Sequence, residues 1–222
     1  LILHVDKGKD IFLTLAGTFQ RSCFGMSLEL LSRYPGPVRT TQPLPPDTPP
    51  EARLAIPKEL WRIVDYLYRF GMEEPDIFFQ SGSADMAQIR DCLDTGESFS
   101  THAFNVHSMA NTLVNFLCGL SEPVIPASLF QRALDVSGTF ASCRQLVATQ
   151  LSAVHYNTFY YITSFFREVL TFSPANGLTV QNVAFLLGQC LLRSPAPIKK
   201  KDLQSCRCKM TAFIRHFLLE EK

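Results

Sequence analysis

The sequence predicts a mainly α-helical protein with a short β segment at its N-terminus. From residue 57 onward, apolar side chains recur at three- and four-residue spacing, which is the period of an amphipathic helix. Residues 1–19 instead hold two runs rich in β-branched and aromatic residues on either side of a polar turn. Of the 222 residues, 46% are hydrophobic and 18% are charged, so the chain can bury a core.

The first expected element is a β-hairpin. Its strands are predicted at residues 1–5 and 11–19, around the turn Asp6-Lys7-Gly8-Lys9-Asp10. A lone hairpin is marginally stable in water and leaves both of its edges unpaired. Because the sequence opens within a strand, we expect the hairpin to end a sheet whose other strands lie upstream in a longer protein. The alternative is that it packs on the helical part.

A proline-rich segment is expected to separate this β segment from the helices. A short helix is predicted from its N-cap Ser27 to Tyr34. Seven prolines then fall within residues 35–50, and proline fixes φ and removes a backbone donor, which predicts an extended linker. The expected organisation is the end of a β domain at residues 1–34, a linker at residues 35–56 and a helical domain at residues 57–222.

The helical domain is predicted as a succession of amphipathic helices. Pro57 suits the first helical position, and Leu60, Trp61 and Val64 begin an apolar face. Thr179 is the expected N-cap of a helix that runs to residue 192. The other helices are expected at residues 83–93, 108–120, 127–136, 140–153, 157–172 and 202–219.

Charge and cysteine content narrow the class of function. A formal net charge of +1 gives no reason to expect a nucleic-acid partner. No apolar run is long enough to cross a bilayer and no signal peptide is present, so we expect a cytosolic protein. The seven scattered cysteines predict free, mostly buried thiols. Cys206 and Cys208 point to different sides of a helix and lack a second ligand pair, so no metal or other cofactor is expected.

Four stretches resemble the RhoGAP domain, the GTPase-activating module for Rho-family G proteins. The first is the loop Ile77-Phe78-Phe79-Gln80-Ser81-Gly82, similar to I-F-x-x-S-G of the family. Residues 113–126 are similar to L-K-x-F-L-R-E-L-P-E-P-L-I-P, and residues 182–192 to N-L-A-x-V-F-G-P-N-L-L. Between them, Asn157 begins a matching apolar helix to Leu170. The resemblance spans residues 57–222 and implies an all-helical, RhoGAP-like fold.

The N-terminal residues narrow the resemblance. Residues 4–14 and Ser22-Cys23-Phe24-Gly25 are similar to the end of the immunoglobulin-like ASH domain in inositol polyphosphate 5-phosphatases of the Lowe-syndrome type. Those proteins place an ASH domain directly before a RhoGAP-like domain. The chain contains no phosphatase domain, so the resemblance does not imply phosphoinositide hydrolysis by this chain. The linker has no acidic clathrin-box segment, which favours the paralogue of the Lowe-syndrome enzyme.

The resemblance places Phe79 where the family has its catalytic arginine. An arginine finger stabilises charge on the transferring phosphoryl group and is worth about 10³–10⁵ in rate. Phenylalanine has no hydrogen-bond donor and no charge, and the neighbouring Gln80 has no formal charge. In the other matched runs, Val114 replaces the family lysine, Cys118 an arginine and Cys190 an asparagine.

We therefore interpret the chain as a non-catalytic docking module. The resemblance implies Rho- and Rab-family GTPases and F&H-motif adaptor peptides as partners, with peripheral membrane association on endosomes and the Golgi through the full-length protein. The candidate partner-binding residues are Trp61, Phe24, Phe79, Gln80, Val114, Cys118, Asn182 and Cys190. One alternative is an active GTPase-activating protein that uses Arg69 or Arg90; another is a helical scaffold without a GTPase partner.

Three aromatic side chains leave alternatives open. Trp61 matches a family position in the groove for F&H peptides, but a tryptophan on an apolar helix face is as readily part of a core. Phe24 matches a position linked to Rab binding, or it packs on the linker. We expect Phe79 to lie in the helical core, with an exposed anchor for a partner as the alternative.

Overall fold

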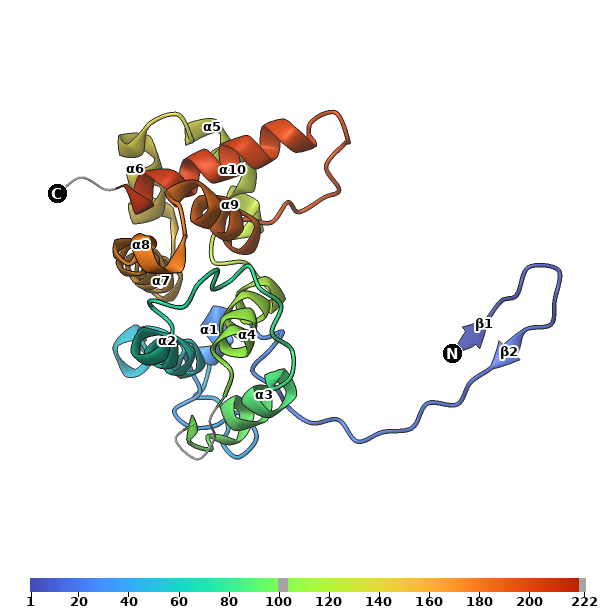
Figure 1. The fold of residues 1–222 in the computed structure, drawn as a ribbon. Helices are drawn as coiled ribbons and strands as arrows, with labels where there is room; N and C mark the ends of the chain where they lie inside the picture. Colours follow the sequence, from blue (N-terminus) through green and yellow to red (C-terminus); the bar gives the residue numbers. More distant parts are fainter. Residues whose placement is uncertain (100–103, 220–222) are drawn as a thin grey trace.

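Helices account for most of the structure, a computed structural model that describes residues 1–99 and 104–219 (Figure 1). The predicted fold class, mainly α with an N-terminal β-hairpin, is confirmed. The strands and α-helices are β1 Ile2–Leu3, β2 Ile11–Phe12, α1 Leu28–Leu31, α2 Lys58–Phe70, α3 Met86–Thr95, α4 Val106–Gly119, α5 Phe130–Val136, α6 Phe140–Gln150, α7 Ala153–Thr171, α8 Ser173–Asn176, α9 Val180–Leu191 and α10 Leu203–Leu218. Short 3₁₀ turns cover Pro50–Ala52 and Ala127–Leu129.

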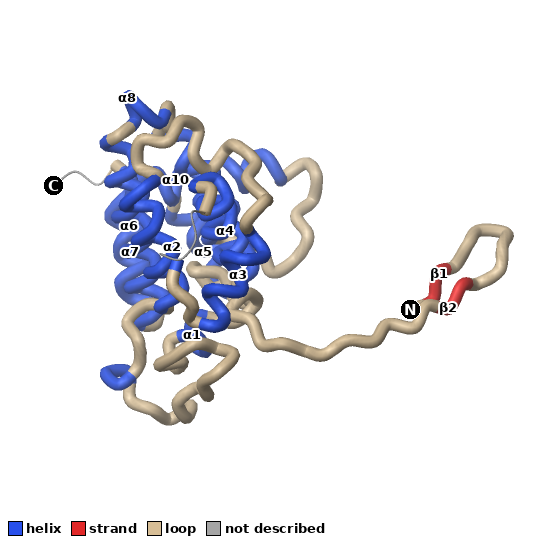
Figure 2. The backbone as a smooth tube through the Cα atoms, turned by 60° about the horizontal axis from the view of Figure 1, so that its bottom comes forward, coloured by secondary structure: helices blue, strands red, loops and turns tan. Residues whose placement is uncertain are grey.

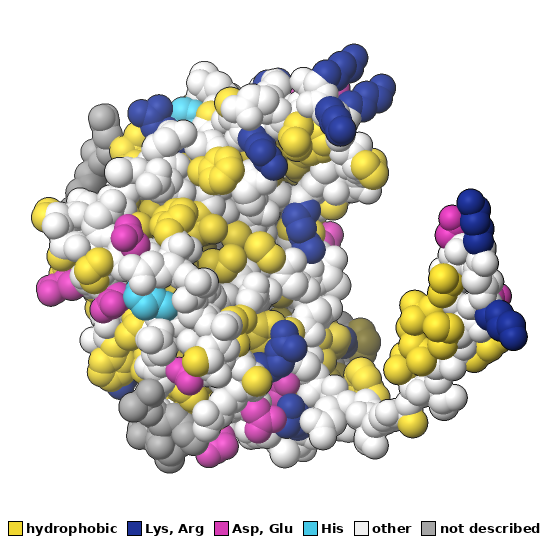
Figure 3. All heavy atoms as spheres, turned by 45° about the vertical axis from the view of Figure 1, so that its right-hand side comes forward, with side chains coloured by type: hydrophobic (Ala, Val, Ile, Leu, Met, Phe, Trp, Pro, Cys, Tyr) yellow, Lys and Arg dark blue, Asp and Glu magenta, His cyan; other side chains and the backbone are white. Residues whose placement is uncertain are grey.

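The hairpin extends away from the helices, as Figure 2 shows. β1 and β2 are antiparallel with Ile2 opposite Phe12, and each is only two residues long, much shorter than predicted. Within the described residues no third strand covers this pair, so Phe12 and Phe19 are 74% and 89% exposed. Apolar side chains cover much of one side of the hairpin in Figure 3. Packing of the hairpin on the helical part, the alternative, is wrong; an upstream sheet stays a prediction.

Residues 21–56, here called the strap, fold against the helices. The expectation of an extended linker at residues 35–56 is wrong, because Val38 is fully buried in the same core as the helices. The Leu44 N–H also donates to the Arg33 carbonyl at 2.8 Å, which folds the segment back on itself. Ser27 caps α1 as predicted, accepting from the Leu30 N–H at 3.2 Å. That residues 1–34 end an ASH domain stays a prediction.

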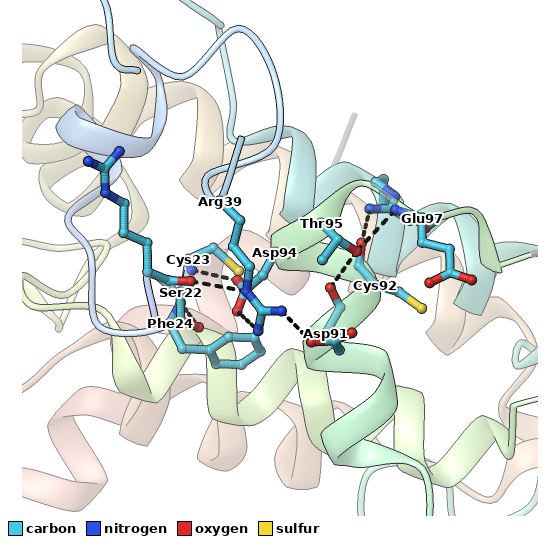
Figure 4. Close-up of polar contacts among 11 residues, drawn as sticks. Ser22, Cys23, Phe24, Arg39, Asp91, Cys92, Asp94, Thr95 and Glu97 are labelled. Atoms are coloured by element: carbon cyan, nitrogen blue, oxygen red, sulfur yellow. Dashed lines mark hydrogen bonds and ion pairs between the residues drawn. The ribbon is translucent and has the colours of Figure 1, made fainter. Parts of the chain in front are cut away.

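A buried carboxylate fixes the strap to α3 (Figure 4). Asp94 is fully buried, and its Oδ1 accepts from the Cys23 N–H at 2.7 Å. Arg39 lies with Nη2 at 3.6 Å from Asp94 Oδ2, and its Nη1 pairs with Asp91. The Arg39 N–H donates to the Asp94 carbonyl at 3.1 Å. A carboxylate is costly to bury unless it is paired and hydrogen-bonded, so Asp94 stabilises the docked strap through these partners.

α4 lies at the centre of the helical body. It contacts α2 and α3 in the lower half of Figure 1 and α9 in the upper half. α10 packs along α9 and also contacts α5, α6 and α7, around the buried rings of Phe159, Phe213 and Phe217. Every predicted helix from residue 57 onward has a counterpart. α8 was not predicted; it is a single turn that Gly177 closes with a φ of 72°.

We expect Asp94→Ala to lower the free energy of unfolding by about 3–5 kcal/mol, because it leaves the Cys23 N–H without its acceptor and Arg39 without its buried ion-pair partner. Asp91→Ala is the matched control, since Asp91 pairs with the same arginine but has a side chain 53% exposed. That variant should lose at most about 1 kcal/mol. Urea unfolding measures both. Equal losses would contradict the role given to Asp94.

Candidate functional site

The loop between α2 and α3 directs its two phenylalanines in opposite directions. Phe78 is 6% exposed and Phe79 is 48% exposed. The expectation that Phe79 lies in the helical core is therefore wrong; Phe78 takes that place, with its ring centroid 4.8 Å from that of Phe166 on α7. The reason is the φ of Phe78, 76°, in the left-handed region that bulky residues rarely adopt. This reversal of the backbone turns the next side chain outward.

The base of the loop is fixed to the end of α7 and α8. Asn176 is fully buried, and its Nδ2 donates to the carbonyls of Met72 and Val169, both at 2.9 Å. The Asn176 carbonyl in turn accepts from the Asp76 N–H at 2.9 Å. Asp76 also has a positive φ, 52°, and its carbonyl accepts from the N–H groups of both Phe79 and Gln80. The tip of the loop is thus a closed, hydrogen-bonded turn.

α4 holds the other side of the loop. Asn111 Nδ2 donates to the carbonyls of Gln80 at 3.3 Å and Gly82 at 3.0 Å. A Cβ at Gly82 would lie 2.6 Å from the Ser108 nitrogen, so the loop backbone sits directly against the helix. Since both sides of the loop are anchored, Phe79 and the exposed Gln80 stand on a rigid base.

Two further candidate residues continue along the same face of α4. Val114 and Cys118 follow Asn111 at spacings of three and four residues, which places all three on one side of the helix. Val114 is half-buried and Cys118 is exposed. Cys190 of α9 meets this face from the neighbouring helix and is 2% exposed. The structure therefore brings together Gln80, Val114, Cys118 and Cys190, as a row beside the loop, from residues far apart in sequence.

Phe24 and Asn182 do not belong to this row. The Phe24 ring stands edge-on to Phe116 of α4, with centroids 5.5 Å apart, and the Arg90 guanidinium lies 4.3 Å from its centroid. These ring partners come from α3 and α4, and packing of Phe24 on the linker stays a prediction. Asn182 is exposed in the first turn of α9, eight residues and about 12 Å from Cys190 along the helix.

Trp61 lies between two grooves on the surface of α2. It is 51% exposed, so the alternative that it forms part of the core is wrong. The larger groove has a volume of about 970 Å³ and the smaller, between α2 and α7, about 400 Å³. Among the described residues, four aromatic side chains line the larger groove together with Trp61: Tyr66, Phe70, Phe99 and Phe104. These four residues were not predicted from the sequence, although Phe99 and Phe104 stand out as aromatic residues in a Ser- and Thr-rich loop.

Comparison with known proteins identifies the family. The family model of the RhoGAP domain matches residues 57–196 of this chain. The chain belongs to the RhoGAP domain family. It is 37% identical over 232 residues to the type II inositol 1,4,5-trisphosphate 5-phosphatase of Mus musculus. This alignment covers 98% of this chain and 23% of that protein. It is 30% identical to Rho GTPase-activating protein 24 of Homo sapiens, covering 85% of this chain and 25% of that protein. The chain thus spans about a quarter of the length of these relatives.

Solved structures agree with the fold of this RhoGAP domain. Human Rho GTPase activating protein 15 superposes with a TM-score of 0.68 at 16% identity, over 75% of this chain and 82% of that one. The BH domain of Graf, the GTPase regulator associated with focal adhesion kinase, gives a TM-score of 0.64 at 15% identity, over 73% and 89% of the two chains. The resemblance to the RhoGAP-like region of inositol 5-phosphatases is confirmed by the family match together with the 37% identical relative.

An active GTPase-activating protein would have to use Arg69 or Arg90, but both side chains of this RhoGAP domain interact with other residues of the chain. Arg69 pairs with Asp65 one turn earlier on α2, at 3.1 Å. Arg90 stacks on the ring of Phe24. None of the helices in the described ranges is long and apolar enough to cross a bilayer.

Two alanine variants distinguish the buried residue that anchors the loop, Phe78, from the exposed residue at its tip, Phe79. We expect Phe78→Ala to lower the free energy of unfolding by about 3–5 kcal/mol, because it leaves a cavity against Phe165 and Phe166. Phe79→Ala, the matched control, should change it by no more than about 0.5 kcal/mol. Urea unfolding monitored by the fluorescence of Trp61 measures both. A large loss for Phe79→Ala alone would contradict the described orientation.

Proposed function

We propose that this RhoGAP domain binds small GTPases without accelerating GTP hydrolysis. The observation that carries the proposal is Phe79, exposed at the tip of an anchored loop, at the position where the resemblance places the catalytic arginine. A missing arginine finger corresponds to about 4–7 kcal/mol of transition-state stabilisation. An aromatic ring provides neither the charge nor the donors for it. It is instead the kind of exposed apolar group that anchors protein interfaces.

The neighbouring row supports a docking surface that differs from that of an active domain. Val114, Cys118 and Cys190 stand where the resemblance expects lysine, arginine and asparagine. Three polar or charged side chains are thus replaced by less polar ones beside Phe79. Polar contacts that would hold a GTPase are lost together with the arginine finger, while shape complementarity and apolar contact remain as sources of affinity.

The grooves beside Trp61 suit an aromatic peptide. We assign F&H-motif adaptor peptides to the larger one, since its aromatic rings match a phenylalanine anchor and its volume exceeds that of a single side chain. Phe24 is the proposed contact for Rab-family GTPases; it is only half-buried on the strap.

The proposed setting is an inositol 5-phosphatase of which this chain is the RhoGAP-like region. The 37% identical relative over nearly the whole chain supports it. In that setting the domain is cytosolic and reaches endosomes and the Golgi as a peripheral part of the full-length protein. It would there link phosphoinositide turnover to GTPases and adaptors.

An active GTPase-activating protein is the rival function, and single-turnover hydrolysis separates the two. Adding the chain to GTP-loaded Rho-family GTPases should leave the hydrolysis rate within about tenfold of the intrinsic rate, because no guanidinium stands at position 79. Phe79→Arg should by itself recover little stimulation of GTP hydrolysis, since Val114, Cys118 and Cys190 remain.

Stimulation of about 10³-fold by the unmodified chain would overturn the proposal. Co-precipitation with GTP-loaded GTPase, measured in parallel, distinguishes docking from a scaffold that binds none.

The groove assignment has its own test. Trp61→Ala should weaken binding of a fluorescent F&H peptide at least about tenfold, because a partly exposed tryptophan is a typical hot spot. Phe185→Ala is the matched control: Phe185 is 44% exposed on α9 and lines neither groove. Fluorescence anisotropy gives both affinities. Equal binding by both variants would remove the groove from the proposed function.

A further inference from the structure

Two cysteine side chains meet where the last turns of α4 and α9 come together. Cys118 is the penultimate residue of α4 and is exposed; Cys190 is the penultimate residue of α9 and is 2% exposed. Their thiols interact with one another across the contact between the two helices. Both are free thiols.

Hydrogen bonds on either side of this pair hold the two helix ends together. Arg193, just after α9, donates from Nη1 to the Cys118 carbonyl at 3.1 Å and from Nη2 to the Leu120 carbonyl. The Ile125 N–H donates to the Leu191 carbonyl at 3.0 Å, next to Cys190. These bonds tie the end of α4 and the chain after it to the end of α9. The two sulfur atoms are therefore kept together by groups other than themselves.

The surroundings give the two thiols different reactivity. Interaction with Cys190 and the positive charge of Arg193 together lower the pKa of Cys118 to about 7, although partial burial opposes them. The pKa of Cys190 is raised far above its ordinary value, by its interaction with Cys118 and by burial. At pH 7 about half of Cys118 is therefore the accessible thiolate, beside the protonated thiol of Cys190. The thiolate is the nucleophilic form of cysteine, and exposed low-pKa thiols are the ones that oxidants reach.

We propose that Cys118 and Cys190 form a redox-active dithiol that hydrogen peroxide converts to a disulfide between α4 and α9. The Cys118 thiolate attacks one peroxide oxygen, the O–O bond breaks, and the leaving hydroxide takes a proton to become water. The product is a sulfenic acid on Cys118. The Cys190 sulfur then attacks the Cys118 sulfur, and the hydroxide that departs leaves as water with the proton of Cys190. Two thiols lose two electrons in total, and one peroxide is reduced to two waters.

Of the other cysteines, Cys23, Cys92 and Cys143 are buried, and Cys206 and Cys208 lie on α10. Cys23 is buried against Asp94, and the Cys143 thiol donates to the Val136 carbonyl at 3.3 Å. Cys208 is exposed on α10, where Gln204 Nε2 lies 3.7 Å from its sulfur, and it serves as a matched control with similar access to solvent. Its neighbour Cys206 is two residues away and points to another side of the helix.

Peptide mapping of the full chain tests the site. The reduced protein is treated with hydrogen peroxide at pH 7, alkylated and digested. We expect a Cys118–Cys190 linked peptide, an intact mass lower by about 2 Da and reversal by dithiothreitol. Cys118→Ser and Cys190→Ala should each abolish the linked peptide, with the sulfenic acid of Cys118 trapped by dimedone in Cys190→Ala. Cys208→Ser should retain the link.

A second measurement does not depend on any variant folding. In the unmodified chain at pH 7, iodoacetamide should modify Cys118 about threefold faster than Cys208, because Cys190 and Arg193 stabilise the Cys118 thiolate. Three results would overturn the proposal: Cys118 oxidised to sulfinic acid without a link, equal yields of links to other cysteines, or modification of Cys118 no faster than that of Cys208.

Discussion

The buried carboxylate of Asp94 links segments that the sequence keeps far apart. It accepts the N–H of Cys23, 71 residues earlier, and pairs with Arg39 in the middle of the strap. α3, which carries it, packs on α4, and α4 holds the loop through Asn111. A continuous chain of contacts therefore leads from one buried charge to the side chain at the tip of the candidate site. A charge in this position needs its partners in order to remain buried, which is why the strap is part of the helical body.

The contacts that hold the loop do not depend on which side chain stands at its tip. Side-chain amides, a close backbone approach and a buried ring orient the loop, and none of these contacts involves the side chain of residue 79. The base of the loop can therefore stay the same with an arginine or a phenylalanine at its tip. Under the proposed function, the domain uses this geometry to display an apolar group.

Helix positions and caps follow from local sequence, and this is why they could be predicted. Ser27 and Thr179 cap their helices through their own side chains, and apolar spacing defines the rest. The direction of Phe79 could not be predicted, because periodicity does not apply across a residue with positive φ. The spacing of Trp61 matches the apolar face of α2, yet this side chain is exposed because Leu60, Ile63, Val64 and Leu67 already fill that face. The docking of the strap depends on Asp94, a partner distant in sequence that local patterns do not reveal.

Gly82 has a consequence for how this site can vary among related sequences. Its φ is not in the left-handed region, so glycine is required here by space: any larger residue would meet the backbone of α4. Replacement by alanine would therefore act as a wedge that moves the loop as a unit and leaves every partner-facing side chain chemically unchanged. A substitution at this one position would change how far residue 79 projects from the surface without changing the residues that make up that surface.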